Sequence, residues 1–168
     1  MFMRSLVLYF SVTNNTKVVA KEIAKQMKAD IQEIKPIKAY AKDYEKVLAK
    51  GIKEIKSNYK PEIYDLDIDF DKYDMIFIGS PNWLDKYAPP IATFLDEYKI
   101  EYKIVVPFVT HGKGGKGIVD AEIRKQLPKC RVLDSIAIQG RGGETLSHDI
   151  EIAIARKNLH NLNMPVVR

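Results

Sequence analysis

Five runs of mainly apolar residues recur along this chain, and each is followed by a stretch with the spacing of an amphipathic helix. The first of them contains SLVLYF (5–10), which is mainly apolar and does not alternate with polar residues. A strand with one face in water shows alternation, whereas a parallel strand covered on both faces does not. The pattern therefore predicts an α/β fold in which a mainly parallel sheet carries helices on both faces.

Turn and capping residues set the boundaries of these elements. We expect strands at 2–10, 31–35, 73–80, 103–110 and 131–139, and helices at 14–28, 43–55, 89–98, 118–127 and 146–159. Asn14 or Asn15 can cap the first helix. Residues 59–70 are interpreted as a surface connection. Because 168 residues suffice for one sizeable core, we expect a single domain spanning 1–168.

The second expected helix has an unusual composition. Asp43 can cap it, and Gly51 within it should weaken it by about 1 kcal/mol. Its apolar residues recur on one face, which we expect to pack: Tyr44, Val47, Leu48, Ile52 and Ile55.

Composition and charge exclude several classes of protein. No apolar run approaches the roughly 20 residues of a membrane span, and no signal-peptide cleavage site follows the N-terminus. The single cysteine, Cys130, excludes an internal disulfide and suggests a cytoplasmic location. The net charge of +5 comes with lysines spaced along helical stretches, as on solvated faces, and without an Arg-rich tract or interleaved aromatics. We therefore expect neither a nucleic-acid partner nor a membrane partner.

Three of the expected strands end in unusual loops. SVTNNT (11–16) follows the first strand, SPNWLDKYAPP (80–90) the third, and THGKGGKG (110–117) the fourth. In a sheet ordered 2-1-3-4-5, the first and third strands are neighbours at the topological switch point, where doubly wound folds bind ligands. The three loops should therefore converge on one crevice.

The first loop combines donors that a phosphate would need. Ser11, Thr13 and Thr16 offer hydroxyl groups and Asn15 offers an amide. The N–H groups that open the following helix have no intrahelical partner, and the helix dipole favours an anion there. An ordinary helix cap uses one or two such side chains. Four within six residues favour a phosphate site over a simple cap.

The other two loops allow alternatives. Trp83, the only tryptophan, lies among turn residues, so it can contact a planar aromatic ligand or simply close the core under the loop. Gly112, Gly114 and Gly117 form a G-x-G-x-x-G pattern that can indicate an NAD site. That fingerprint normally occupies the first strand-to-helix turn, where this chain has the polar loop instead. His111 can lie beside a ligand or in solvent.

Metal-binding and acid–base constellations are missing from the sequence. Three scattered histidines, one cysteine and no H-E-x-x-H motif or clustered carboxylates argue against a metal site. The nucleophile motif G-x-S-x-G is absent as well. We therefore expect no catalytic side chain and no metal.

The loops also resemble those of a known family. SVTNNT resembles the flavodoxin phosphate loop, usually S/T-x-T-G-N-T. IFIGSPNWLDKYAPPIATFLDEY (76–98) resembles the next flavodoxin segment, with its G-x-P-x-W-W turn. PFVTHGKGGKG (107–117) resembles the P-F-x-T-H-G-G-x-G loop of one subgroup, VLDSIAIQG (132–140) its fifth strand, and EIKPIKAY (33–40) the start of its lengthened second crossover. The resemblance covers essentially the whole chain.

This resemblance implies a fold and a cofactor. The fold is the flavodoxin-like three-layer doubly wound sandwich, with a five-stranded parallel sheet of order 2-1-3-4-5. The cofactor is noncovalently bound FMN, with the phosphate in the first loop and Asn82 near the ribityl chain or the ring. The implied cofactor-binding residues are Ser11, Thr13, Asn14, Asn15 and Thr16, then Pro81, Asn82, Trp83 and Leu84, and finally Thr110, His111, Gly112, Gly114 and Gly115.

Four features depart from the family pattern. Asn14 stands in place of the phosphate-loop glycine, although asparagine tolerates left-handed backbone better than most residues. Leu84 replaces a second tryptophan. Asp85 replaces a glycine in the turn that, in flavodoxins, flips a peptide to stabilise one-electron-reduced flavin. Flavodoxins are also typically acidic, whereas this chain is basic.

The resemblance implies an electron-transfer protein that carries electrons between redox partners. One alternative is an FMN-dependent NAD(P)H oxidoreductase of quinones or other small acceptors. Another is a binding or regulatory module of the same fold without flavin. The implied partners are redox proteins or small-molecule electron acceptors, and we expect a monomer or a weak homodimer. A response regulator is disfavoured, because Phe10 and Ser11 stand where its phosphoacceptor aspartate would be.

Overall fold

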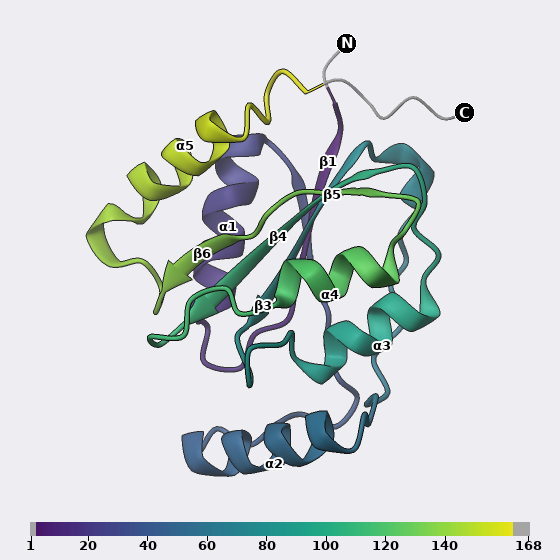
Figure 1. Cartoon of the computed structure of the whole chain (residues 1–168), viewed down its shortest axis with the longest axis vertical. Helices are drawn as coiled ribbons and strands as arrows, with labels where there is room; N and C mark the ends of the chain where they lie inside the picture. The colour runs from purple at the N-terminus through teal and green to yellow at the C-terminus, as the bar shows by residue number, and fades with distance from the viewer. Residues whose placement is uncertain (1–2, 163–168) are drawn as a thin grey trace.

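The computed structural model describes residues 3–162 and contains one parallel sheet flanked by helices (Figure 1). The strands are β1 (Ser5–Tyr9), β2 (Asp30–Glu33), β3 (Met75–Pro81), β4 (Ile104–His111), β5 (Arg131–Val132) and β6 (Ile136–Gln139). The helices are α1 (Asn15–Met27), α2 (Tyr44–Lys56), α3 (Pro89–Glu97), α4 (Val119–Gln126) and α5 (Leu146–Arg156), with short 3₁₀ turns η1 (Phe70–Lys72) and η2 (Gly143–Thr145). The strand order β2-β1-β3-β4-β5 confirms the predicted α/β fold and sheet order.

The two faces of the sheet carry separate apolar cores, which explains the continuous apolar runs. Leu6 and Leu8 of β1 point to the face covered by α3 and α4. Val7 and Tyr9 point to the face covered by α1 and α5. Because consecutive side chains on a strand alternate between faces, a central strand in this arrangement needs an apolar residue at every position.

The fifth predicted strand is interrupted. Residues 131–139 were expected to be continuous, but β5 and β6 pair with β4 separately, with 133–135 between them. There the Ser135 N–H donates to the buried carboxylate of Asp120 at 3.1 Å, so the backbone leaves the sheet at that point.

The second crossover differs from the expectation in its position and contacts. Figure 1 shows α2 beyond the end of the sheet where the strands finish, away from the two layers of flanking helices. Its buried residues are Val47, Gly51 and Glu54. Tyr44 is 69% exposed and Leu48 39% exposed, so the predicted packing face is wrong for these two residues. The predicted cap is confirmed, because the Asp43 carboxylate accepts from the Lys46 N–H at 3.0 Å.

The connection from 59 to 70 is partly buried, which corrects its interpretation as a surface segment. Ile63 and Leu66 are buried, and Ile63 forms an antiparallel bridge with Pro36. The Leu66 N–H donates to the hydroxyl of Tyr98 at 2.8 Å. The bridge ties the returning segment to Pro36, which follows β2, and the Tyr98 hydroxyl ties it to the end of α3, so both ends of the crossover that carries α2 are held in place.

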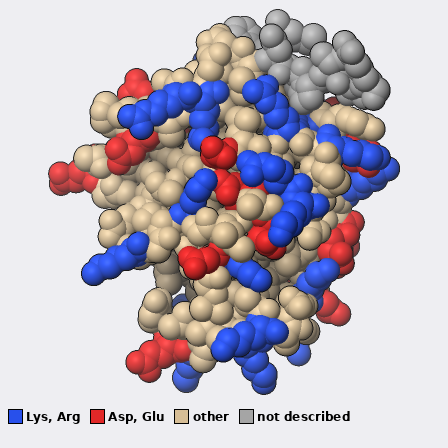
Figure 2. Space-filling model, viewed as in Figure 1, with Lys and Arg blue, Asp and Glu red and all other residues tan. Residues whose placement is uncertain are grey.

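The surface visible in Figure 2 mixes positive and negative side chains over most of its area. This mixture matches the solvated helical faces expected from the lysine spacing. Within residues 3–162, no helix combines the length and apolar character needed to cross a bilayer.

Candidate functional site

The three unusual loops meet at the carboxyl ends of β1, β3 and β4, where they surround a cavity of about 230 Å³. Larger hollows lie elsewhere, such as one of about 790 Å³ between β6 and α5, but this cavity is the one that gathers the loops singled out by sequence. Its lining comes from the loops, from α2 and from the end of β6: Val12, Thr13, Asn15, Thr16, Tyr44, Val47, Leu48, Pro81, Asn82, Trp83, Thr110, His111, Gly112 and Gly140.

Asn14 gives the first loop the backbone of a glycine-containing turn. Its φ of 66° and ψ of 1° lie in the left-handed region, which glycine occupies freely and asparagine tolerates. Asn14 occupies one of the two N-cap positions predicted for α1, but its side chain makes no capping bond. Ser11 Oγ accepts from the Lys17 N–H at 3.3 Å. Among the described residues, no side chain caps Asn15 or Thr16, which leaves their N–H groups directed at the loop.

Two buried threonines join the first loop to the third. Thr16 is 2% exposed and Thr110 4%, and their hydroxyl oxygens lie 2.7 Å apart. A hydroxyl offers one donor and two acceptor positions, so this bond leaves each side chain with hydrogen-bonding capacity. Thr13 is exposed at the mouth of the same loop.

Arg141 also contacts the first loop, and sequence reasoning missed it. Its Nε donates to Asn15 Oδ1 at 3.1 Å and its Nη2 to the Thr13 carbonyl at 3.4 Å. The available signal was an arginine between Gly140 and Gly142, directly after the last strand. Because all strands are parallel, that position lies at the same edge of the sheet as the other loops. The first loop therefore has a positively charged side chain beside its hydroxyl, amide and N–H groups.

Trp83 packs in the core and also reaches the cavity. Its ring lies edge-on to Phe10 and Tyr40, with centroids 5.7 and 5.3 Å away, so it helps to close the core. It also lines the cavity. Gly51 of α2 permits this position, because a Cβ there would lie 2.7 Å from Trp83 Cε3. Gly51, which we expected to weaken the helix, is the residue of α2 that the Trp83 ring contacts.

A buried polar pair holds α2 beside Trp83. The Tyr40 hydroxyl donates to the Glu54 carboxylate at 2.5 Å, and Lys50 Nζ lies 3.9 Å from the other oxygen of that carboxylate. Burial, together with the hydrogen bond and the charge of Glu54, raises the pKa of Tyr40 far above its ordinary value. The tyrosine therefore remains a neutral donor, and the crossover stays attached to the helix.

The turn after Trp83 is a tight hairpin with unusual residues. Trp83 and Lys86 exchange backbone hydrogen bonds of 3.0 and 3.1 Å, while Leu84 (φ 53°) and Asp85 (φ 63°) occupy the left-handed region between them. Two consecutive positive φ angles are typical of a type I′ turn, which normally uses asparagine or glycine. Leu84 is 47% exposed and does not line the cavity, so the structure does not bring this predicted site residue into it.

The third loop packs directly on the second. The Asn82 amide donates to the Gly115 carbonyl at 2.9 Å, and the Ile118 N–H donates to the Asp85 carbonyl at 2.7 Å. Gly117 has a φ of 57°, and a Cβ on it would overlap the Asp85 backbone. Gly114 and Gly117 of the glycine pattern therefore lie where the third loop approaches the second.

The remaining predicted residues of the third loop divide into two groups. His111 and Gly112 line the cavity, whereas Gly114 and Gly115 contact the second loop and do not line it. The Nδ1 atom of His111 is buried without a hydrogen-bond partner among the described residues. A ligand polar group in the cavity could supply that missing partner.

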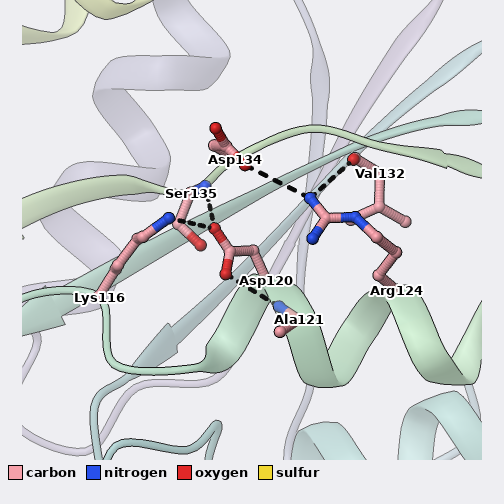
Figure 3. A network of polar contacts seen from close by, with 7 residues as sticks. All are labelled: Lys116, Asp120, Ala121, Arg124, Val132, Asp134 and Ser135. Carbon is pink, nitrogen blue, oxygen red and sulfur yellow. Dashed lines mark hydrogen bonds and ion pairs between the residues drawn. The ribbon is translucent and has the colours of Figure 1, made fainter.

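A polar network anchors the far end of the third loop (Figure 3). The Asp120 carboxylate pairs with Lys116 Nζ at 2.7 Å and accepts from the N–H groups of Ser135 and Ala121. Burial alone would raise the pKa of Asp120, but the bonds from Lys116 and the two N–H groups outweigh burial and lower it. The carboxylate is therefore charged at neutral pH and fixes the loop to α4 and to the segment before β6.

The cavity contains no carboxylate. None of its described lining residues is an aspartate or a glutamate. Among residues 3–162, no three side chains of histidine, cysteine, aspartate or glutamate gather in a way that could hold a metal ion. The arrangement offers hydroxyl groups, amides, aromatic rings and backbone N–H groups, which suit a ligand with an anionic end and a planar aromatic end.

Comparison with known proteins gives a family and individual relatives. A family model described as flavodoxin matches residues 4–151. The flavodoxin-like domain-containing protein BilS of Clostridioides difficile (strain CD3) is 30% identical over 149 residues, which cover 86% of this chain and 70% of that protein.

Solved structures give the same result. A protein from Bacteroides uniformis ATCC 8492, described as a flavoprotein, shares 27% identity with a TM-score of 0.78, covering 90% of this chain and 99% of that one. A flavoprotein from Lactobacillus acidophilus NCFM, solved in complex with FMN, shares 28% identity with a TM-score of 0.68, covering 82% of this chain and 92% of that one.

Proposed function

The chain belongs to the flavodoxin family, and on that premise we propose that it binds FMN noncovalently and carries electrons between redox partners. The observation that carries the proposal is the left-handed Asn14, which gives the first loop the backbone of a phosphate loop without its glycine. The FMN complex of the Lactobacillus acidophilus flavoprotein, 28% identical to this chain, supports the same cofactor. We propose further that residues 1–168 form one flavodoxin-like domain, monomeric or weakly dimeric, in the cytoplasm.

The residues present fit FMN in three parts. Ser11, Thr13, Asn14, Asn15, Thr16 and the N-terminal N–H groups of α1 would hold the phosphate. Asn82, Thr110 and His111 offer polar groups for the ribityl chain and the ring edge. The His111 Nδ1, which finds no hydrogen-bond partner within residues 3–162, marks one such position. Pro81, Trp83 and Gly112 would shield the ring. Leu84, Gly114 and Gly115 would act from outside the cavity, by shaping the second and third loops.

FMN supplies the redox chemistry when bound, and the protein supplies binding, orientation and electrostatics. The cavity of about 230 Å³ is smaller than the roughly 300–1,000 Å³ of typical cofactor sites. We therefore expect α2, which buries only three residues, to move outward when the ring enters. Tyr44, Val47 and Leu48 on this helix would then exclude water from one side of the ring.

The lack of carboxylates in the cavity predicts an unusually high reduction potential. Full reduction places negative charge on the flavin, and nearby carboxylates disfavour that charge. We expect the potential of the fully reduced couple to be less negative than in acidic flavodoxins, measured by potentiometric titration of the FMN-loaded protein. Leu48→Glu, which adds a carboxylate to the lining, should lower it by tens of millivolts. A potential as low as that of acidic flavodoxins, unaffected by Leu48→Glu, would contradict this prediction.

The same feature favours a second candidate function, an FMN-dependent NAD(P)H oxidoreductase of quinones or other small acceptors. A higher potential makes reduction by a nicotinamide easier. Oxidation of NAD(P)H by the FMN-loaded protein, with and without a quinone, separates the two functions. A carrier shows negligible catalytic turnover, whereas sustained turnover with a quinone would replace the carrier function with the oxidoreductase.

A further inference from the structure

Arg141 lies at the mouth of the first loop although it is 126 residues away from Asn15 in the sequence. It belongs to the turn between β6 and η2, where Gly140, Gly142 and Gly143 all have positive φ angles. These glycines let the chain reverse sharply after the last strand. The reversal places the arginine side chain over Asn15 and Thr13.

The hydrogen bonds of Arg141 do not neutralise its positive charge. Both acceptors, Asn15 Oδ1 at 3.1 Å and the Thr13 carbonyl at 3.4 Å, are neutral. Among the described residues, no carboxylate lies within ion-pair distance of its guanidinium. A guanidinium carries five N–H donors in a planar fork, and these two bonds engage only Nε and Nη2. The rest of the fork remains available beside the uncapped N–H groups of α1.

We propose that Arg141 is a phosphate ligand that makes the site selective for the phosphomonoester of FMN over riboflavin. The inference rests on the proposed FMN function and adds a charged residue to a loop whose other donors are neutral. Charge-assisted, forked contacts to phosphate are among the strongest hydrogen bonds in proteins. The bonds to Asn15 and Thr13 already hold the side chain beside the loop, so little conformational freedom is lost when the phosphate arrives.

The test compares the dissociation constants of FMN and riboflavin, measured by quenching of flavin fluorescence at fixed ionic strength. For Arg141→Gln we expect FMN binding to weaken about tenfold or more, with riboflavin changed less than about threefold. Arg141→Lys keeps the charge without the fork and should weaken FMN less than Arg141→Gln does. The matched control is Arg156→Gln on α5, which removes the same charge from an exposed position away from the cavity and should change neither constant.

The outcomes separate the inference from the function on which it rests. If Arg141→Gln weakens both flavins equally, or weakens neither, the arginine only positions the turn and the inference is wrong. A loss for Arg156→Gln equal to that for Arg141→Gln would show a general charge effect and would also overturn it. If the unaltered protein binds neither flavin, the proposed function itself fails.

Discussion

Replacing Gly117 by alanine is expected to separate the second loop from the third and to destabilise the protein by about 2–5 kcal/mol. Two costs add. The φ of 57° at Gly117 is unfavourable for alanine by about 1–2 kcal/mol, and the new methyl group would lie 2.6 Å from Asp85 Cα, in overlap with the Asp85 carbonyl. Crowding of this kind typically costs about 1–3 kcal/mol. The bond from the Ile118 N–H to the Asp85 carbonyl would be lost as the loops move apart.

Urea unfolding measures this effect, and Gly112→Ala is its matched control. Gly112 belongs to the same loop, but a Cβ there meets no atom within 4 Å and its φ lies outside the left-handed region. We expect its stability to change by less than about 0.5 kcal/mol. FMN affinity should also fall in Gly117→Ala, because Asn82 and Gly115 would no longer be held together. Equal stabilities for the two variants would show that the loops do not need this close approach.

Replacing Thr13 and Thr16 together by valine is expected to weaken FMN binding about a hundredfold while changing riboflavin binding far less. Each hydroxyl would lose a hydrogen bond to a charged phosphate, typically about 1.5–3 kcal/mol, and tenfold corresponds to about 1.4 kcal/mol. Fluorescence titration with the two flavins measures the difference. Equal losses for both flavins would mean that these hydroxyl groups support the structure of the first loop and do not bind the phosphate.

Thr16 requires a control of its own, because its hydroxyl lies 2.7 Å from that of Thr110. Thr16→Val therefore breaks a buried bond in addition to any phosphate contact. Thr110→Val breaks the same bond from the β4 side and leaves the first loop unchanged in sequence. We expect Thr110→Val to weaken FMN and riboflavin to a similar extent, whereas Thr16→Val should be selective for FMN.

The sheet and the position of the site could be predicted from the sequence, because both depend on features that recur in several strands and loops. Mainly apolar stretches such as SLVLYF (5–10) need two covered faces, and parallel strands bring their ends to one edge. The three loops that meet at the cavity were therefore identifiable together. The backbone of Asn14 was also predictable, because few residues other than glycine and asparagine tolerate the left-handed region.

The position of α2 could not be predicted from the sequence, because most of the contacts that hold this helix are not apolar. Periodicity predicted the helix correctly at 43–55. However, it packs through Val47, Gly51 and Glu54, of which only Val47 carries an apolar side chain. The spacing of apolar residues cannot identify a glycine that leaves room for the Trp83 ring. It also cannot identify a glutamate that is buried against Tyr40.

Single long-range contacts were also missed. At the break between β5 and β6, the Ser135 N–H donates to Asp120, fifteen residues earlier. Arg141 reaches Asn15 across 126 residues. Neither contact produces a periodic pattern in the sequence, because each is made by one side chain that only the fold brings to its partner.

The most direct test of FMN binding is a titration of the purified protein with FMN, followed by its visible spectrum and by flavin fluorescence. We predict a yellow complex that persists through gel filtration, contains one FMN per chain, and shows quenched flavin fluorescence. Riboflavin should bind more weakly, because it lacks the phosphate held by the first loop. Absence of a coloured complex together with unquenched fluorescence at FMN concentrations well above that of the protein would contradict the account.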